Sequence, residues 1–154
     1  EYPSTAFSMD EIIAHIAASM AQIDTPSLNI IGHSLGAVAA RALLKQQQDH
    51  PIIEHFIAMG APFNGTAWYP VAPARLRTSF HPQSPWIAHL NASPEHPNLH
   101  IIRARHDQNV RPSSSASLPG IPETMLEDIG HNGLINHPSS FQAVWDVLST
   151  QRDI

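Results

Sequence analysis

A serine flanked by two glycines, after an apolar run and before a run of small residues, constrains the fold of this chain most. Residues 30–37 read IIGHSLGA, which contains the pattern G-x-S-x-G. Gly32 and Gly36 fit a bend so tight that side chains at these two flanking positions would collide. The pattern therefore predicts a strand, a sharp turn and a helix. It would hold the Ser34 hydroxyl exposed at the carboxyl edge of a sheet, with the N-terminus of a helix behind it.

The remainder of the chain alternates predicted strands with helices and loops. Ser8 and Glu11 form a capping box that opens a predicted helix over residues 8–23. Apolar runs predict strands over 28–32, 52–59, 99–104 and 123–129. Helical signals predict helices over 35–45, over 85–91 within a proline-rich excursion from 60 to 97, and from Pro138, the last with Phe141, Val144, Trp145 and Leu148 on one face. This order predicts an α/β fold with a mostly parallel sheet of about four strands.

Composition sets limits on the possible functions. The 154 residues are expected to form a single domain over 1–154. The net charge is −5 and the eight Lys and Arg are scattered, so no nucleic-acid partner is expected. Cysteine is absent, which excludes disulfides and a cysteine nucleophile. No apolar run approaches the ~18 residues of a membrane span. The eleven histidines are dispersed and HExxH is missing, so neither a metal site nor a cofactor is predicted.

A serine hydroxyl becomes a good nucleophile only beside a base, and a histidine base needs an acid to fix its tautomer. Asp107 follows the third predicted strand, and His131 follows the fourth. Both lie where the carboxyl ends of parallel strands place ligand sites. Asp128 is the alternative acid, but it precedes His131 by only three residues and is poorly placed to reach the far ring nitrogen. His33 is expected to be a packed or hydrogen-bonded residue.

The chain is similar to the C-terminal portion of an α/β-hydrolase, in particular the small bacterial lipase-like and esterase-like members. The motifs that carry the resemblance are Tyr2-Pro3-Ser4, GHSLG at 32–36, GAPFNGT at 60–66, the segment 107–114 and Gly130-His131-Asn132. The resemblance implies Ser34 as nucleophile, His131 as general base, Asp107 as its orienting acid and the backbone N–H of Leu35 as an oxyanion donor. It also implies a small ester or lipid substrate, cleaved through an acyl-serine.

The chain departs from that family in one respect. The family places strands and a βα loop before the helix at 8–23, and this loop supplies a second oxyanion donor. Loss of a donor typically costs about 10²–10³ in rate. We therefore expect residues 1–154 to be the C-terminal part of the domain, with N-terminal strands missing and an apolar strand edge at 28–32 left bare. An upstream segment or another copy of the chain would then complete the sheet.

Two alternatives stay open. In one, the chain is a naturally minimal hydrolase whose second donor comes from the Gly60–Thr66 loop. In the other, it is a non-catalytic remnant or binding module that lacks a complete oxyanion hole.

Overall fold

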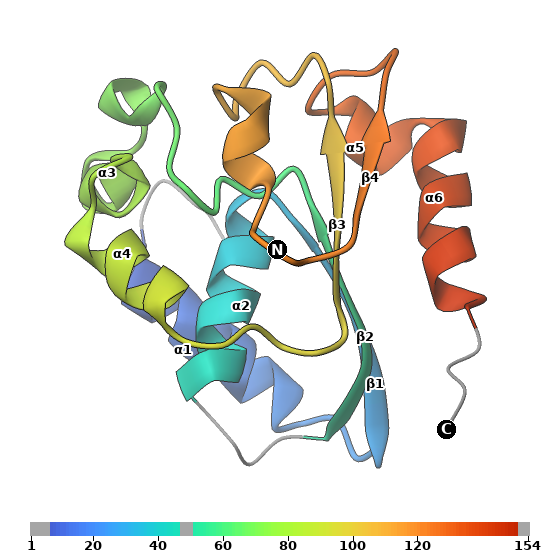
Figure 1. The fold of residues 1–154 in the computed structure, drawn as a ribbon. Helices are drawn as coiled ribbons and strands as arrows, with labels where there is room; N and C mark the ends of the chain where they lie inside the picture. Colours follow the sequence, from blue (N-terminus) through green and yellow to red (C-terminus); the bar gives the residue numbers. More distant parts are fainter. Residues whose placement is uncertain (1–6, 47–50, 151–154) are drawn as a thin grey trace.

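The computed structural model describes residues 7–46 and 51–150, so the Tyr2-Pro3-Ser4 motif lies outside the described residues. Four parallel strands form one sheet in the order β1-β2-β3-β4 (Figure 1). The strands are β1 (Ser27–His33), β2 (Ile52–Met59), β3 (Leu99–Ala104) and β4 (Glu123–Leu126). The helices are α1 (Met9–Met20), α2 (Leu35–Gln46), α3 (Ala74–Phe80), α4 (Pro85–Ala92), α5 (Gly133–Asn136) and α6 (Pro138–Leu148). This is the α/β arrangement, with a parallel sheet of four strands, that the sequence predicts.

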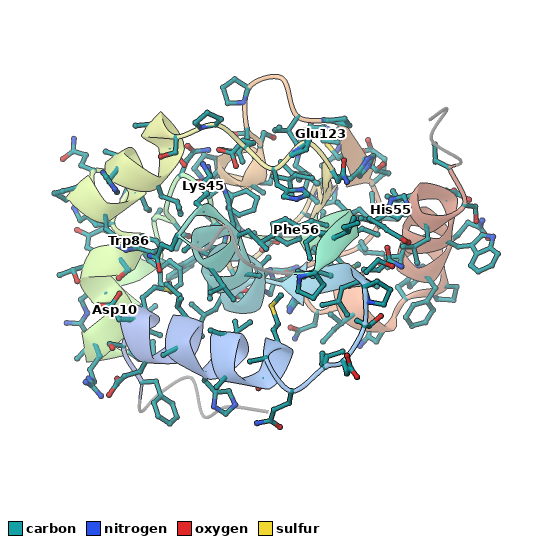
Figure 2. All side chains as sticks on the ribbon, turned by 90° about the horizontal axis from the view of Figure 1, so that it is seen from below. Asp10, Lys45, His55, Phe56, Trp86 and Glu123 are labelled. Carbon is teal, nitrogen blue, oxygen red and sulfur yellow. The ribbon has the colours of Figure 1, made fainter. Side chains whose placement is uncertain are left out.

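Helices cover the sheet unequally on its two faces. Helices α1 to α4 lie on one side and α6 lies on the other (Figure 1). The alternation of side chains along β2 divides the core accordingly. Phe56 and Ala58 pack in the cluster that includes α1 and α2, whereas Ile57 and Met59 pack in the cluster that includes Leu134. Figure 2, seen from below the first view, shows Phe56 near the centre of the molecule.

The start of α1 is as the sequence predicts, and its end is not. Ser8 accepts a hydrogen bond from the backbone N–H of Glu11, whose side chain reaches back to the N–H of Ser8, so the predicted capping box is confirmed. Helix α1 nevertheless ends at Met20 rather than at residue 23. Ile23 is about half exposed, so it adds no core contact that would extend the helix.

Two other expectations need correction. Strand β4 ends at Leu126 rather than 129, because its partner β3 ends at Ala104 and offers no further residue to pair with. The excursion between β2 and β3 holds two helices rather than one. The additional helix, α3, is stabilised by burial of Leu76 and Phe80.

The outer edge of β1 bears an apolar surface. Among the described residues, β1 pairs only with β2, and Ile31 is 51% exposed. Within the described residues β1 is therefore an unpaired edge strand, as expected.

The four apolar residues predicted on one face of α6 do line one hollow, and Phe141 (59%) and Trp145 (65%) are largely exposed there. No helix of the described chain is long and apolar enough to cross a bilayer.

A buried ionic cluster joins α2 to the excursion above the sheet. Arg41 is 1% exposed and contacts Glu95 through two guanidinium nitrogens, one of them at 2.7 Å. Lys45 reaches the same carboxylate at 2.7 Å, and Arg41 also donates to Asn91 on α4 at 2.8 Å. The Arg41 guanidinium lies 4.8 Å from the Phe63 ring centroid. These bonds hold α4 and the loop after β2 against the helix that follows Ser34.

Candidate active site

Ser34 lies at a strained turn between β1 and α2. Its φ of 53° is the only positive value at a non-glycine position in the described chain, a conformation that costs roughly 1–3 kcal/mol. The Ser34 N–H donates to the carbonyl of Met59, at the end of β2, over 2.8 Å. A Cβ at Gly32 would come within 2.6 Å of the Ala37 Cα, so the turn requires glycine there. The predicted strand, turn and helix are thus present with Ser34 at the bend.

Gly36, the second glycine of the G-x-S-x-G pattern, lies beyond the bend rather than in it. It is the second residue of α2 and is half-buried, and the positive φ at this turn belongs to Ser34. Its helical backbone is a conformation that any residue can adopt. The structure therefore gives a steric reason for glycine at Gly32, whereas the collision expected from a side chain at Gly36 stays a prediction.

Asp107 and His131 meet after the ends of β3 and β4. The Asp107 Oδ2 and His131 Nδ1 atoms are 2.8 Å apart, and both residues are 4% exposed. The second carboxylate oxygen, Oδ1, accepts the backbone N–H groups of Asn109 and Val110, each at 2.8 Å. Asp128 is exposed and has no hydrogen bond to His131 within residues 7–46 and 51–150. The structure therefore brings together the favoured acid and the histidine.

The protonation of this pair follows from its contacts. Burial by itself raises the pKa of the Asp107 carboxyl, but hydrogen bonds from His131, Val110 and Asn109 outweigh burial and leave that pKa below its usual value. An ionised carboxylate only accepts hydrogen bonds, so Nδ1 of His131 carries the proton. In the neutral imidazole the other nitrogen, Nε2, carries no proton and can act as a base.

His33, inside the G-x-S-x-G segment, packs against this pair. Its ring centroid lies 4.6 Å from that of His131, and its Nε2 donates to the His131 carbonyl over 3.3 Å. Burial, followed by the nearby His131, lowers the pKa of the His33 imidazole, which therefore stays neutral near pH 7. His33 is a packed, hydrogen-bonded residue, as expected from the sequence.

The loop after β2 is hydrogen-bonded to the loop that carries Asp107. A Cβ on Gly60 would lie 3.3 Å from both Asp107 Oδ2 and His131 Nδ1, and the φ of Gly60 is +56°. Thr66 Oγ1 donates to the carbonyl of Asn109 at 2.8 Å and accepts the N–H of Arg111 at 3.0 Å. The GAPFNGT segment thus fixes the position of the chain that carries Asp107.

A cavity of about 560 Å³ opens beside Ser34. Ser34 and Leu35 line it together with Gln108, Asn109 and Thr66. The remaining wall is apolar and consists of Pro62, Trp68, Val71, Ala72, Phe80 and Val110. A concave apolar space with a few polar groups beside a nucleophilic side chain is the usual form of a small-molecule site.

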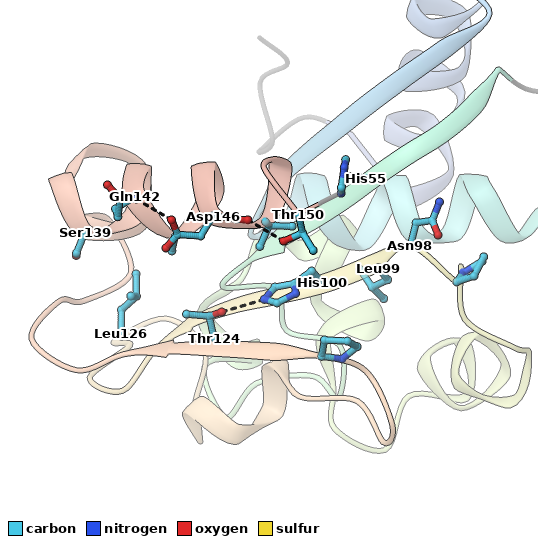
Figure 3. Close-up of a pocket in the computed structure, with 14 residues that line it drawn as sticks. His55, Asn98, Leu99, His100, Thr124, Leu126, Ser139, Gln142, Asp146 and Thr150 are labelled. Carbon is cyan, nitrogen blue, oxygen red and sulfur yellow. Dashed lines mark hydrogen bonds between the residues drawn. The ribbon is translucent and has the colours of Figure 1, made fainter. Parts of the chain in front are cut away.

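A second cavity, of about 540 Å³, lies between α6 and the sheet (Figure 3). Its residues Leu99, His100 and Thr124 belong to the first residues of β3 and β4, at the opposite strand ends from Ser34. His100 is 2.9 Å from Thr124 Oγ1, and Gln142 donates to Asp146 at 2.7 Å. Within the described residues no carboxylate bonds to His100, so the His100–Thr124 contact lacks an acid like the one that His131 has in Asp107. Nowhere in the described chain do three or more metal-ligating side chains gather as a metal site.

Comparison with known families decides the relationship of this chain. Residues 2–96, which include the Ser34 turn and the Gly60–Thr66 loop, match the family model described as palmitoyl protein thioesterase. The chain belongs to the palmitoyl protein thioesterase family. Among curated proteins no sequence matches significantly.

Solved structures agree with the fold expected of this family. A lipase from Bacillus licheniformis, BlEst2, superposes with a TM-score of 0.78 at 14% identity, over 97% of this chain and 77% of its own. The phospholipase PlaB of Legionella pneumophila gives a TM-score of 0.75 at 14% identity, over 99% of this chain and 50% of PlaB. The lin2722 gene product of Listeria innocua gives a TM-score of 0.69 at 19% identity, over 95% of this chain and 68% of its own. Each of these structures contains a further part that this chain does not match. Over the matched part, all three share the fold of this chain.

Sequence reasoning missed one residue at this site. Gln108 lines the cavity beside Ser34, and its side-chain oxygen accepts the backbone N–H of His131 at 3.1 Å. The only feature of the sequence that could have pointed to Gln108 is its position directly after Asp107. A single glutamine has no residue-type pattern that would mark this role.

Proposed function

We propose that the protein hydrolyses acyl esters through an acyl-serine intermediate. Ser34 is the nucleophile, His131 the general base and Asp107 the residue that orients His131. The observation that carries the proposal is the buried Asp107–His131 contact of 2.8 Å, at the strand ends where the strained Ser34 turn also lies. Nucleophile, acid and base follow one another along the chain in the order typical of α/β-hydrolases.

The proposed reaction has two halves. The Ser34 oxygen attacks the carbonyl carbon of the substrate while Nε2 of His131 takes the hydroxyl proton. The backbone N–H of Leu35, at the N-terminus of α2, donates to the developing oxyanion. The leaving group then departs with the proton from His131. Water, activated by the same imidazole, next attacks the acyl-serine, releases a carboxylic acid and restores Ser34.

The cavity supports an apolar acyl group as the bound part of the substrate. Its wall is mainly hydrocarbon and aromatic, with Phe80 and Val110 buried in it. The leaving group is an alcohol in the first candidate substrate class. Thioesters are the second candidate, and the match of residues 2–96 to a thioesterase family favours them. Both classes pass through the same acyl-serine.

The proposal predicts steady-state turnover of both classes. Initial rates are measured with p-nitrophenyl esters from acetyl to octanoyl, and with thioesters that carry the same acyl groups. We expect kcat/KM to rise with acyl length within the series, because a longer chain buries more apolar surface in the cavity. A folded protein, checked by circular dichroism, that turns over none of these substrates would contradict the proposal. That outcome would favour the non-catalytic binding module.

A further inference from the structure

Gln108 connects the cavity to the backbone of His131. Its Oε1 accepts the His131 N–H at 3.1 Å, and the same side chain lines the cavity beside Ser34. The two residues are 23 positions apart, so this bond joins the loop after β3 to the loop after β4. Gln108 thus holds the backbone of His131, whereas Asp107 holds its imidazole ring.

The side-chain amide of Gln108 also packs against Gly130, the residue that precedes His131. A Cβ on Gly130 would lie 2.4 Å from Oε1 and 2.5 Å from Nε2 of Gln108, so the amide packs directly on the Gly130 backbone. The hydrogen bond and this packing both act on the peptide group between Gly130 and His131, and together they restrain its position.

The imidazole needs this restraint because its other contacts restrict it only in part. Asp107 holds Nδ1, and His33 bonds the His131 carbonyl at 3.3 Å. The backbone N–H of His131 is left to Gln108. Displacement of a catalytic group by about 1 Å can cost on the order of 10²-fold in rate. Loss of the Gln108 bond would let the loop that carries the base shift relative to Ser34.

We propose that Gln108 is a positioning residue, whose side-chain carbonyl fixes the backbone of His131 and thereby the proton acceptor for Ser34. The proposal rests on the proposed function, since it assigns His131 as the base. Gln108 acts through His131 and takes no proton itself. Loss of its hydrogen bond should lower kcat and leave KM nearly unchanged, because the position of the base matters in the transition state and little in substrate binding.

Three variants at this contact test the proposal. Gln108→Met keeps the length of the side chain but removes the acceptor, and Gln108→Glu keeps an acceptor oxygen. We expect kcat of Q108M to fall about tenfold with KM within about twofold, and Q108E to retain most of the wild-type kcat. Gly130→Ala should push the amide away and reproduce the kcat loss of Q108M. Gln83→Met, at an exposed position outside the cavity lining, is the matched control and should leave both constants unchanged.

A double-mutant cycle separates positioning from a structural effect. In a Gln108→Ala background, Gly130→Ala meets no amide, so its effect on kcat should nearly vanish. Additive losses would contradict the proposal, as would equal kcat for Q108M and the wild type, or equal losses for Q108M and Q108E. Fluorophosphonate titration counts the reactive sites in each variant, so a loss of folded protein is not read as a loss of kcat. Failure of the proposed function would look different, because the wild type itself would be inactive.

Discussion

Ser34→Ala is expected to abolish ester hydrolysis, with a fall in kcat on the order of 10⁴-fold or more. In the proposed mechanism the Ser34 side chain supplies the oxygen that becomes acylated, so the variant would have no path through an acyl-enzyme. The fold should persist, because the turn is held by the backbone bond from Ser34 to Met59 and by the close approach at Gly32. Initial rates with a p-nitrophenyl ester measure the change.

Backbone strain at Ser34 calls for a second variant. Alanine at a φ of 53° is strained much as serine is, whereas Ser34→Gly relieves the strain. Both variants should be inactive, and S34G should be at least as stable to heat as S34A. Ser114→Ala, at an exposed serine, is the control and should keep the wild-type rate. If S34A or S34G hydrolysed the ester at the wild-type rate, the nucleophile would lie elsewhere.

Asp107→Asn is expected to lower kcat by roughly 10³–10⁴-fold. An amide at this position can present its N–H₂ to Nδ1 of His131, which moves the imidazole proton to Nε2 and removes the base. The fold should be affected much less, because the asparagine keeps an oxygen for the N–H groups of Asn109 and Val110. Thermal unfolding and kcat measured on the same sample separate the two effects.

Asp128→Asn is the matched control for this substitution. Asp128 is exposed and stands three residues before His131, so its replacement removes the same charge close by in the sequence. The kcat of this variant should stay within about twofold of the wild type. The reverse pattern, an inactive D128N and an active D107N, would assign the acid to Asp128.

Features with short-range causes were predictable from the sequence. The start of α1 depends on Ser8 and Glu11, which are three residues apart, and the structure shows both hydrogen bonds. The Ser34 turn depends on glycine next to a bend and on Ala37, five residues beyond Gly32. The parallel direction of the strands followed from apolar runs separated by helices and long connections. For the start of α1 and the Ser34 turn, the residues that decide the structure lie close together in the sequence.

Features with long-range causes were not predictable. Helix α3 has no capping side chain, and it forms where Leu76 and Phe80 reach the core. Arg41 lies within a stretch of small and apolar residues on α2, and its burial depends on Glu95, 54 positions away. Periodicity showed that Phe141 and Trp145 share a face of α6, but it carried no information on what covers that face. Gln108 likewise depends on a contact 23 positions away.

Covalent labelling of Ser34 tests the central claim most directly. The wild-type protein is incubated with a fluorophosphonate, and its intact mass and tryptic peptides are measured by mass spectrometry. We expect one adduct per chain, located on Ser34, absent from S34A and formed much more slowly in D107N. A folded wild-type protein that stays unmodified, or that carries its adduct on another serine, would contradict this claim.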